Sequence, residues 1–337
     1  MPIGTSGAVK TLLPQELYDV NTAIILGNTY HLFLRPGHDL IHRIGGLHKF
    51  MNWGKSILTD SGGFQVYSLA KLNKISDEGV KFQSHIDGSS HFLTPEISME
   101  IQRSLGADII MAFDVCPPGE ATKETVKSAV DQTTKWIKRC KDYLDSSEVP
   151  YDWNQTLFPI IQGGIYPELR KNSVEEMVPY STCGIGIGGL AVGEDKMAMF
   201  ENIAMLDELL PEDQPRYLMG VGRPTDLVRA VQNGMDMFDC VLPTRNGRNG
   251  QLFTSQGVIN IQNSNADLAG ALGQNTWVMV TKNPEWRWAV NEKKSLWYPT
   301  TKIFRQEKAG NWNNVINNIN MDLKKLIKYY ELNFSKN

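Results

Sequence analysis

Eight short apolar runs, each ending at a polar residue or a glycine, alternate with longer helical or loop segments over residues 1 to about 250. Their sequences are MPIGT, TAIILGN, SILTD, DIIMAFD, TLFPIIQ, GIGIGG, RYLMG and MDMFD. Near-continuous apolar strands that alternate with helices are typical of a parallel sheet covered on both faces. Eight such units predict an α/β fold of the (β/α)8 TIM-barrel type. A doubly wound sheet is the alternative, although no GxGxxG turn follows the first strand.

The segments between the runs carry their own signals. A cap, a proline and an acidic residue at 94–96 predict the start of a helix. Ser128–Leu144 and Pro224–Asn233 have amphipathic helical patterns, and Gly234 is suited to a left-handed cap after the second of them. Val66–Phe92 breaks the pattern, because alternating stretches flank the turn sequence DGS. We expect a β-hairpin insertion there.

The residues at the ends of the runs are mostly polar. In a TIM barrel the carboxyl ends of the strands meet at one mouth, which holds the active site. That mouth would contain three carboxylates, two amides and glycines that permit close approach, but no His or Lys at a strand end. The residues concerned are Asn28, Asp60, Asp114, Gln162, Gly189, Gly220 and Asp239.

Three aspartates without a metal-like His or Cys indicate carboxylate chemistry on a neutral or cationic centre. At an anomeric carbon, one carboxylate attacks or shields the oxocarbenium ion while another moves protons. The remaining Asp and the Gln could then read a hydrogen-bonding ring such as a purine. Two alternatives stay open, namely that some of these aspartates cap helices or pair with arginines, and that they bind Mg²⁺.

The stretch Met235–Gly250 joins one of these carboxylates to basic residues. Asp239 ends its apolar run, and Arg245 and Arg248 follow in a segment rich in Asn and Gly. We expect a flexible basic loop at Thr244–Gly250 that can contact phosphate. A solvated loop without a ligand is the alternative.

Composition limits the classes of protein that fit. The net charge of −3 and pI of about 6.1 exclude a polycation, so contact with a nucleic acid would need a local patch. The four cysteines form no CxxC pair, which signals neither a zinc site nor a disulfide framework. No basic and apolar leader opens the chain, and no apolar run approaches the roughly 20 residues that span a bilayer. We therefore expect a cytoplasmic protein without membrane contact.

Long stretches of the chain match one known family. They are GNTYHLFLRPG (27–37), LTDSGGFQVYSL (58–69), FDVCPP (113–118), IIQGGIY (160–166), GIGGLAVGE (186–194), RYLMGVGRPTDL (216–227) and MFDCVLPTRNGRNGQLFT (237–254). With these motifs, residues 1–262 resemble the tRNA-guanine transglycosylases, also called queuine tRNA-ribosyltransferases. The resemblance implies base exchange in tRNA, in which a 7-deazaguanine replaces the wobble guanine of GUN anticodons during queuosine biosynthesis.

The resemblance also implies roles for individual residues. Asp239 would be the nucleophile that forms a covalent ribosyl-enzyme, and Asp60 the proton acceptor for the incoming base, oriented by Asn28. Cys116 and Val192 resemble the bacterial type, which takes the aminomethyl precursor preQ1. The substrate-binding set would be Asp60, Ser61, Phe64, which would stack on the base, Asp114, Gln162, Gly189, Leu190 and Met219. The tRNA-binding set would be Gly220, Val221, Gly222, Arg223, Pro224, Thr225 and Asp226, with Thr244, Arg245, Asn246, Gly247 and Arg248.

Both ends of the chain depart from the family pattern. The resemblance implies a hairpin before the first strand, so we expect an N-terminally truncated barrel. It also implies a CxCxxC cluster and a His for a structural zinc, but residues 264–337 contain no Cys and no His. We therefore expect no cofactor and no zinc subdomain, and a homodimer weakened by that loss. Residues 264–337 instead resemble the last part of GT-B glycosyltransferases of the tetratricopeptide-linked type.

Two other functions are consistent with the same motifs. One is a related transglycosylase that acts on 7-deazaguanine in DNA, although such relatives diverge further in these motifs. The other is an inactive chimeric or truncated relative, against which the presence of both Asp60 and Asp239 argues.

Overall fold

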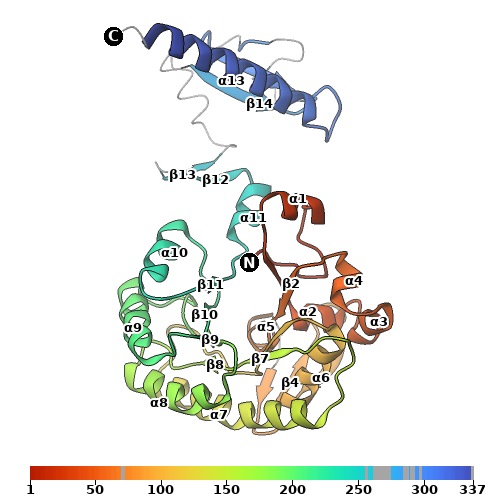
Figure 1. The fold of residues 1–337 in the computed structure, drawn as a ribbon, viewed down its shortest axis with the longest axis vertical. Coiled ribbons are helices and arrows are strands. Elements are labelled where there is room, and N and C mark those ends of the chain that lie inside the picture. The colour runs from red at the N-terminus through yellow and green to blue at the C-terminus, as the bar shows by residue number, and fades with distance from the viewer. Residues whose placement is uncertain are drawn as a thin grey trace. The chain divides into compact units, whose positions relative to one another are not determined.

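The computed structural model describes residues 1–69, 73–254, 257–260, 275–283, 288, 293–295 and 298–334. The chain divides into two compact units, Met1–Arg245 and Asn246–Asn337. Each is considered by itself below, and Figure 1 gives the element labels.

The first unit is built on two four-stranded parallel sheets. Their orders are β1-β2-β6-β7 and β11-β10-β9-β8, and every neighbouring pair within them is parallel. This confirms the predicted α/β class. The strands are β1 (Ile24–Gly27), β2 (Ser56–Thr59), β6 (Ile109–Met111), β7 (Thr156–Phe158), β8 (Ile160–Ile161), β9 (Ile185–Ile187), β10 (Arg216–Leu218) and β11 (Met237–Phe238).

Helices follow these strands along the chain, and in Figure 1 α6 to α9 lie outside the strands. The buried apolar residues of strands and helices form the core of this unit. The helices are α1 (Pro14–Asp19), α2 (Thr29–Leu34), α3 (His38–Ile44), α4 (Leu47–Met51), α5 (Gly63–Leu69), α6 (Pro95–Leu105), α7 (Lys123–Ser146), α8 (Pro167–Met177), the 3-10 helix η1 (Val178–Tyr180), α9 (Lys196–Leu209), α10 (Pro224–Val231) and α11 (Leu242–Arg248).

The predicted helix starts depend on capping residues. At α6 the prediction is confirmed, since the Thr94 hydroxyl accepts a hydrogen bond from the Ile97 amide at 3.2 Å. The prediction for α7 started too late, because Thr122 caps the helix and it begins at Lys123. Gly234 has the expected positive φ of 76°, although α10 already ends at Val231.

The insertion after β2 is larger than predicted. The expected hairpin is confirmed as β4 (Val80–Gln83) paired antiparallel with β5 (Ser90–Leu93). A third strand, β3 (Asn73–Ile75), pairs with β4 on its other side. The predicted start at Val66 was wrong, because that residue lies in helix α5 (Gly63–Leu69).

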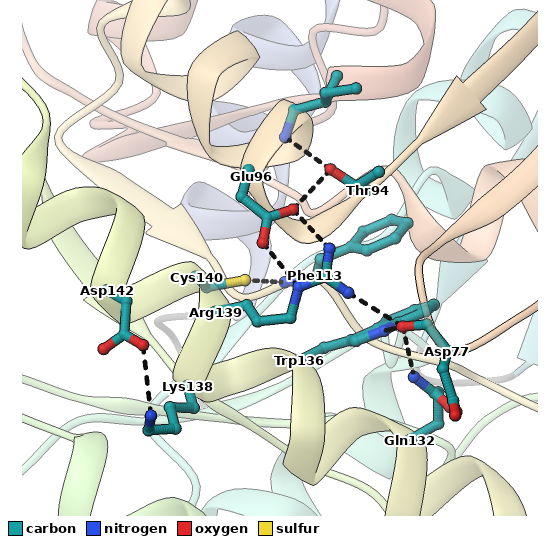
Figure 2. A network of polar contacts seen from close by, with 11 residues as sticks. Asp77, Thr94, Glu96, Phe113, Gln132, Trp136, Lys138, Arg139, Cys140 and Asp142 are labelled. Carbon is teal, nitrogen blue, oxygen red and sulfur yellow. Dashed lines mark hydrogen bonds and ion pairs between the residues drawn. The ribbon is translucent and has the colours of Figure 1, made fainter.

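Side chains of α7 contact both this insertion and the residues that follow β6 (Figure 2). The Arg139 guanidinium donates from Nε and Nη2 to the two oxygens of Glu96, each at 2.6 Å, and from Nη1 to the Asp77 carbonyl at 3.0 Å. The fully buried Trp136 donates from Nε1 to the same carbonyl at 2.9 Å and stacks on Phe113, with ring centroids 4.8 Å apart. The packing of Trp136 therefore couples the insertion to the strand end at Phe113.

Replacing Trp136 should destabilise the first unit strongly. Trp136→Ala removes a buried ring and leaves a cavity, which costs about 3–5 kcal/mol of unfolding free energy. The matched control is Lys138→Ala, on the same helix, because Lys138 is exposed and pairs with Asp142 at 3.5 Å. That control should stay within about 0.5 kcal/mol of the wild type in urea-induced unfolding. Equal losses in the two variants would contradict the assignment of Trp136 to the core.

The prediction of a flexible loop at Thr244–Gly250 is wrong for most of that segment. Helix α11 covers Leu242–Arg248, and Gly250 follows it with a φ of 69°. Pro243 at the start of the helix has a backbone angle that suits its first turn, and the arginines are good helix formers. The asparagine and glycine residues thus sit in a short helix between β11 and the next strand.

The second unit contains two small sheets and a long helix. Strands β12 (Gln251–Thr254) and β13 (Gly257–Asn260) are antiparallel, whereas β14 (Thr276–Val280) and β15 (Thr301–Arg305) are parallel. Helix α13 spans Asn313–Phe334. Residues 264–274 lie outside the described residues, and the resemblance of 264–337 to a glycosyltransferase stays a prediction. Among the described residues, no helix is both long and apolar enough to cross a membrane.

Candidate active site

A cavity of about 480 Å³ lies at the carboxyl ends of the parallel strands of the first unit. It gathers most of the residues that the sequence singled out, from seven different strand ends or the segments after them. Those lining it are Asn28, Asp60, Ser61, Phe64, Asp114, Cys116, Gln162, Gly189, Leu190, Val192, Met219, Gly220, Asp239 and Arg245. A second cavity of about 620 Å³, in the other unit, contains none of the predicted residues.

Asp239 directly follows β11 and is held by one of its two oxygens. Its Oδ1 accepts hydrogen bonds from the Tyr217 hydroxyl at 2.6 Å and from the Gly220 amide at 2.8 Å. Burial raises the pKa of Tyr217 well above its usual value, and the Asp239 charge raises it further, so the phenol stays a donor. No described residue donates to Oδ2 of Asp239. One oxygen is therefore anchored and the other is available to a ligand in the cavity.

Tyr217 should matter for activity because it fixes this carboxylate. Tyr217→Phe removes a hydrogen bond to a charged group, and such bonds contribute about 1.5–3 kcal/mol. We expect kcat to fall about 10- to 100-fold in a steady-state assay of the base exchange that the family resemblance implies. Tyr143→Phe serves as the control, since Tyr143 lies on helix α7 and does not line the cavity. An unchanged kcat in Tyr217→Phe would show that Asp239 needs no support from the phenol.

Asp60 directly follows β2 and is surrounded by donors. Its Oδ2 accepts from the Asn28 amide at 2.6 Å and from the Gln65 amide at 2.9 Å. Its Oδ1 accepts from the backbone amides of Thr29 at 2.9 Å and Gly62 at 3.2 Å. Burial nevertheless raises the pKa of Asp60 to about 6, and the negative charge of Asp239 contributes to the rise. A carboxyl with this pKa can donate or accept a proton near neutral pH.

Asp114 lies three residues beyond the end of β6 and also lines the cavity. It accepts from the Ser61 hydroxyl at Oδ1 and from the Gln162 amide at Oδ2, both at 2.7 Å. Burial raises the pKa of Asp114, although these hydrogen bonds oppose the rise. The pair of Asp114 and Gln162 therefore presents both acceptors and a donor to a planar polar ligand.

Gly189 leaves room for this pair. It has a φ of 64°, and a Cβ at this position would lie 2.4 Å from Oε1 of Gln162. Any larger residue would therefore both strain the backbone and displace the amide. The segment after it is held by Glu194, whose Oε2 accepts from the Val192 amide at 2.9 Å. Burial raises the pKa of the Cys116 thiol to about 12, which makes Cys116 a neutral wall of the cavity.

The mouth of the cavity differs from its floor. Phe64 is 46% exposed there, which fits a ring that stacks on a ligand. His31 also lines the cavity, and its pKa is lowered first by burial and then by His85. The expectation concerned histidines at strand ends, and His31 reaches the cavity from helix α2 instead.

Four of the residues around the carboxylates were missed in the sequence. Tyr217 lies inside a run and reads as core, and Gln65, Thr29 and His31 lie in the helices or turns after the strands. The available signal was their position, since each stands within six residues of a strand end. A polar side chain on the first turn after a barrel strand can reach the mouth.

Most of the segment Gly220–Asp226 lies beside the cavity without lining it. Gly220 binds Asp239, and a Cβ at Gly222 would lie 2.0 Å from Cβ of Cys240. Asp226 pairs with Lys196 at 2.7 Å. Val221, Gly222, Arg223, Pro224, Thr225, Asp226 and Thr244 do not line the cavity, while Asn246, Gly247 and Arg248 belong to the second unit. The role of these residues in tRNA binding stays a prediction.

The Cys and His donor set that the resemblance implies for a structural zinc is missing from the sequence of residues 264–337. Zinc in such sites is held by thiolates and imidazoles, and residues 264–337 offer neither. Cys140 is buried in the core, and Cys116 lies in the cavity. Among the described residues, no group of three or more His, Cys, Asp or Glu side chains could hold a metal ion.

Comparison with known proteins agrees with the geometry of the cavity. The model of the family described as Queuine tRNA-ribosyltransferase matches residues 1–271. Proteins named queuine tRNA-ribosyltransferase from Desulforamulus reducens and Dictyoglomus turgidum are 54% and 55% identical over 264 residues, which are 78% of this chain and 70% and 67% of theirs. The protein of that name from Staphylococcus aureus strain JH9 is 54% identical over 78% of this chain and 68% of its own. The chain therefore belongs to the queuine tRNA-ribosyltransferase family.

Proposed function

We propose that this protein exchanges a base in tRNA, replacing the wobble guanine of GUN anticodons with a 7-deazaguanine in queuosine biosynthesis. The observation that carries the proposal is the hydrogen bonding of the Asp239 carboxylate. One carboxylate oxygen is anchored by Tyr217 and Gly220, and the other is available in a cavity that also contains Asp60 and a base-sized polar pair. The names of the curated relatives support the same reaction.

In the first half of the reaction, Oδ2 of Asp239 attacks C1′ of the target nucleoside. A C1′–O bond forms as the C1′–N9 bond breaks, and the electron pair of the broken bond goes to the leaving guanine. The protonated form of Asp60 supplies the proton that guanine takes up. The product is an ester between Asp239 and the ribose, which makes Asp239 a covalent catalyst.

The cavity floor is suited to hold guanine during this step. A guanine edge presents two adjacent donors, N1–H and N2–H, beside the acceptor O6. The donors match the carboxylate of Asp114, and O6 matches the amide NH2 of Gln162. Phe64 at the mouth can stack on the ring, and Leu190 and Met219 line its apolar contacts.

In the second half, N9 of the incoming base attacks the same C1′ from the side that guanine left. The C1′–O bond to Asp239 breaks, the carboxylate is regenerated, and Asp60 accepts the N9 proton. Two displacements at one carbon retain its configuration. Cys116 and Val192, which line the cavity and resemble the bacterial type, support an aminomethyl base, preQ1, as the incoming substrate, with guanine as the alternative.

We also infer that the two parallel sheets of the first unit close into a (β/α)8 barrel. Two observations support this. Pro159 separates β7 from β8, and its carbonyl accepts from the Gly186 amide at 2.8 Å, so residues 156–161 join the two sheets. At the other junction, the Met1 nitrogen donates to the Phe238 carbonyl at 2.6 Å, while Ile3 bridges to Leu26 of β1.

The tRNA is proposed to approach over Arg245, which lines the cavity, and over the segment Gly220–Asp226. The anionic phosphate backbone of the tRNA would then contact a local basic site, although the chain as a whole has a net charge of −3.

Barrel residues 1–262 and the segment 264–337 are proposed as separate domains. Whether two copies associate is a question for size-exclusion chromatography with light scattering, where we expect at most a weak homodimer.

A base-incorporation assay tests the function. The protein is incubated with labelled guanine and unmodified tRNA that carries a GUN anticodon, and label should enter the wobble position. The same tRNA with adenosine at that position is the matched control. Label in duplex DNA but not in tRNA would favour a DNA-acting enzyme, and a cooperatively folded protein that labels neither would favour an inactive relative.

A further inference from the structure

Arg170, on helix α8, is a charged side chain buried completely behind the cavity. Its Nε donates to the Gly164 carbonyl at 2.9 Å and its Nη1 to the Ile161 carbonyl at 3.2 Å. Its Nη2 is buried and has no hydrogen-bond partner among the described residues. Leaving a buried charged donor unpaired is costly. We therefore expect a hydrogen-bond acceptor near Nη2 of Arg170.

Gln162 supplies an atom of the complementary kind. Its Nε2 donates to Asp114, but its Oε1 is buried and has no partner among the described residues. Gln162 also follows directly after Ile161, whose carbonyl Arg170 holds. Arg170 thus has a buried donor, Nη2, and Gln162 a buried acceptor, Oε1, and neither atom has a hydrogen-bond partner among the described residues.

Gly189 relates the two orphaned atoms in space. A Cβ on Gly189 would lie 2.4 Å from Oε1 of Gln162 and 3.6 Å from Nη2 of Arg170. The two atoms are therefore no farther apart than the sum of these distances, which is about two hydrogen-bond lengths and so the upper limit for one bridging water. Because residue 189 is a glycine, no side chain at this position comes between the two atoms, and a buried water is stable where it finds two or more polar partners.

We propose that Arg170 is a positioning residue of the base site, acting on Gln162 Oε1 through a buried water. The amide nitrogen of Gln162 already donates to Asp114, so Oε1 is the atom left to accept from a water that itself accepts from Nη2 of Arg170. The NH2 group of the amide is then forced toward Asp114 and the ligand. Arg170 thereby fixes the floor of the cavity as an acceptor beside a donor, which is the polarity that guanine needs. The inference rests on the proposed function for its ligand.

The first test is a crystal structure of the unliganded wild-type protein. We expect a water within about 3 Å of both Nη2 of Arg170 and Oε1 of Gln162, with the amide oxygen toward Arg170. An amide with its nitrogen toward Arg170, or two atoms with neither a direct nor a water-mediated hydrogen bond, would overturn the inference. This result does not depend on activity, so it separates the role of Arg170 from the proposed function.

The second test measures the choice between free bases by titration calorimetry. Guanine is compared with 2,6-diaminopurine, which replaces the acceptor O6 with a donor. In Arg170→Met the amide of Gln162 is free to turn, and the preference for guanine should fall about tenfold. Arg170→Lys keeps a buried cation and should recover part of the preference. A ratio equal to that of the wild type in a folded Arg170→Met protein would refute the role.

Arg103→Met is the matched control for this substitution. Arg103 also donates to a backbone carbonyl, that of Leu144, at 3.0 Å, and one of its guanidinium nitrogens is likewise buried without a partner among the described residues. It lies on α6 and does not line the cavity. Its loss should lower the melting temperature without changing the ratio of base affinities. A loss of labelled guanine incorporation with an intact base preference would count against the proposed function and not against Arg170.

Discussion

Asp239→Asn should abolish the covalent complex between the protein and tRNA. The amide that replaces the carboxylate is not a nucleophile, so no C1′–O bond can form. Removal of a catalytic nucleophile typically lowers kcat by about 10⁴-fold or more. On a denaturing gel, wild-type protein incubated with tRNA should show a shifted band, and the variant should show none.

The substitution is suited to this test because it keeps the local hydrogen bonds. The Asn side-chain oxygen can accept from Tyr217 and Gly220 as Oδ1 of Asp239 does. Asp236→Asn is the matched control, because Asp236 precedes the same strand, accepts from the Arg216 amide at 2.9 Å and lies outside the cavity. It should retain the shifted band. A shifted band of normal intensity in Asp239→Asn would exclude Asp239 as the nucleophile.

The strand positions of the first unit were readable in the sequence because parallel strands buried on both faces need nearly continuous apolar runs. The run ending at Asp60 and the run ending at Asp239 stop within one residue of the observed strand ends. The run ending at Asp114 extends beyond β6, which stops at Met111. The apolar runs therefore predicted which segments are buried more accurately than the residues at which strand pairing ends.

The helices and the insertion were harder to place, since their limits depend on local bonds. The start of α7 at Lys123 follows from a cap by Thr122, in a stretch without apolar periodicity. The third strand of the insertion, β3, has three residues and no alternating pattern that sequence could reveal. Helix α11 was read as a loop because its Asn and Gly residues disfavour helix when considered without context.

The candidate site was predictable as a set of strand ends but not as a hydrogen-bond network. Which oxygen of Asp239 is free depends on Tyr217, a residue whose inward direction is set by the pleat of β10. The pairing of Asp114 with Gln162 joins segments far apart in sequence. Neither residue type nor spacing carries this information, because the partners meet only when the strands are assembled.

The two halves of the exchange reaction should depend on pH in opposite directions, because Asp60 donates a proton in one and accepts it in the other. With a pKa of about 6, the free enzyme has a protonated Asp60 below pH 6 and an ionised one above. The value of kcat/KM for tRNA, which reports the first half, should therefore fall as pH rises through about 6. Steady-state kinetics with each substrate varied separates the halves, since double-displacement enzymes treat them independently.

The value of kcat/KM for the incoming base should instead rise with pH, and its midpoint should lie below that of the tRNA limb. The reason is electrostatic. The charge of Asp239 helps to raise the pKa of Asp60 in the free enzyme, and this charge disappears when Asp239 becomes an ester. Formation of the intermediate thus leaves a larger fraction of Asp60 ionised, and able to accept a proton, when the second half requires it.

Asp60→Asn should remove both pH limbs and lower the rate of exchange by about 10²- to 10⁴-fold, the usual contribution of a general acid or base. The covalent band should still appear on long incubation, because Asp239 is intact. Asp108→Asn is the control, since Asp108 lies at the other end of β6, where it accepts from the Ile57 amide at 2.7 Å and pairs with His48. It should keep both limbs. If Asp60→Asn also retained them, the proton would be carried by another group, and the coupling between Asp60 and Asp239 would have no part in catalysis.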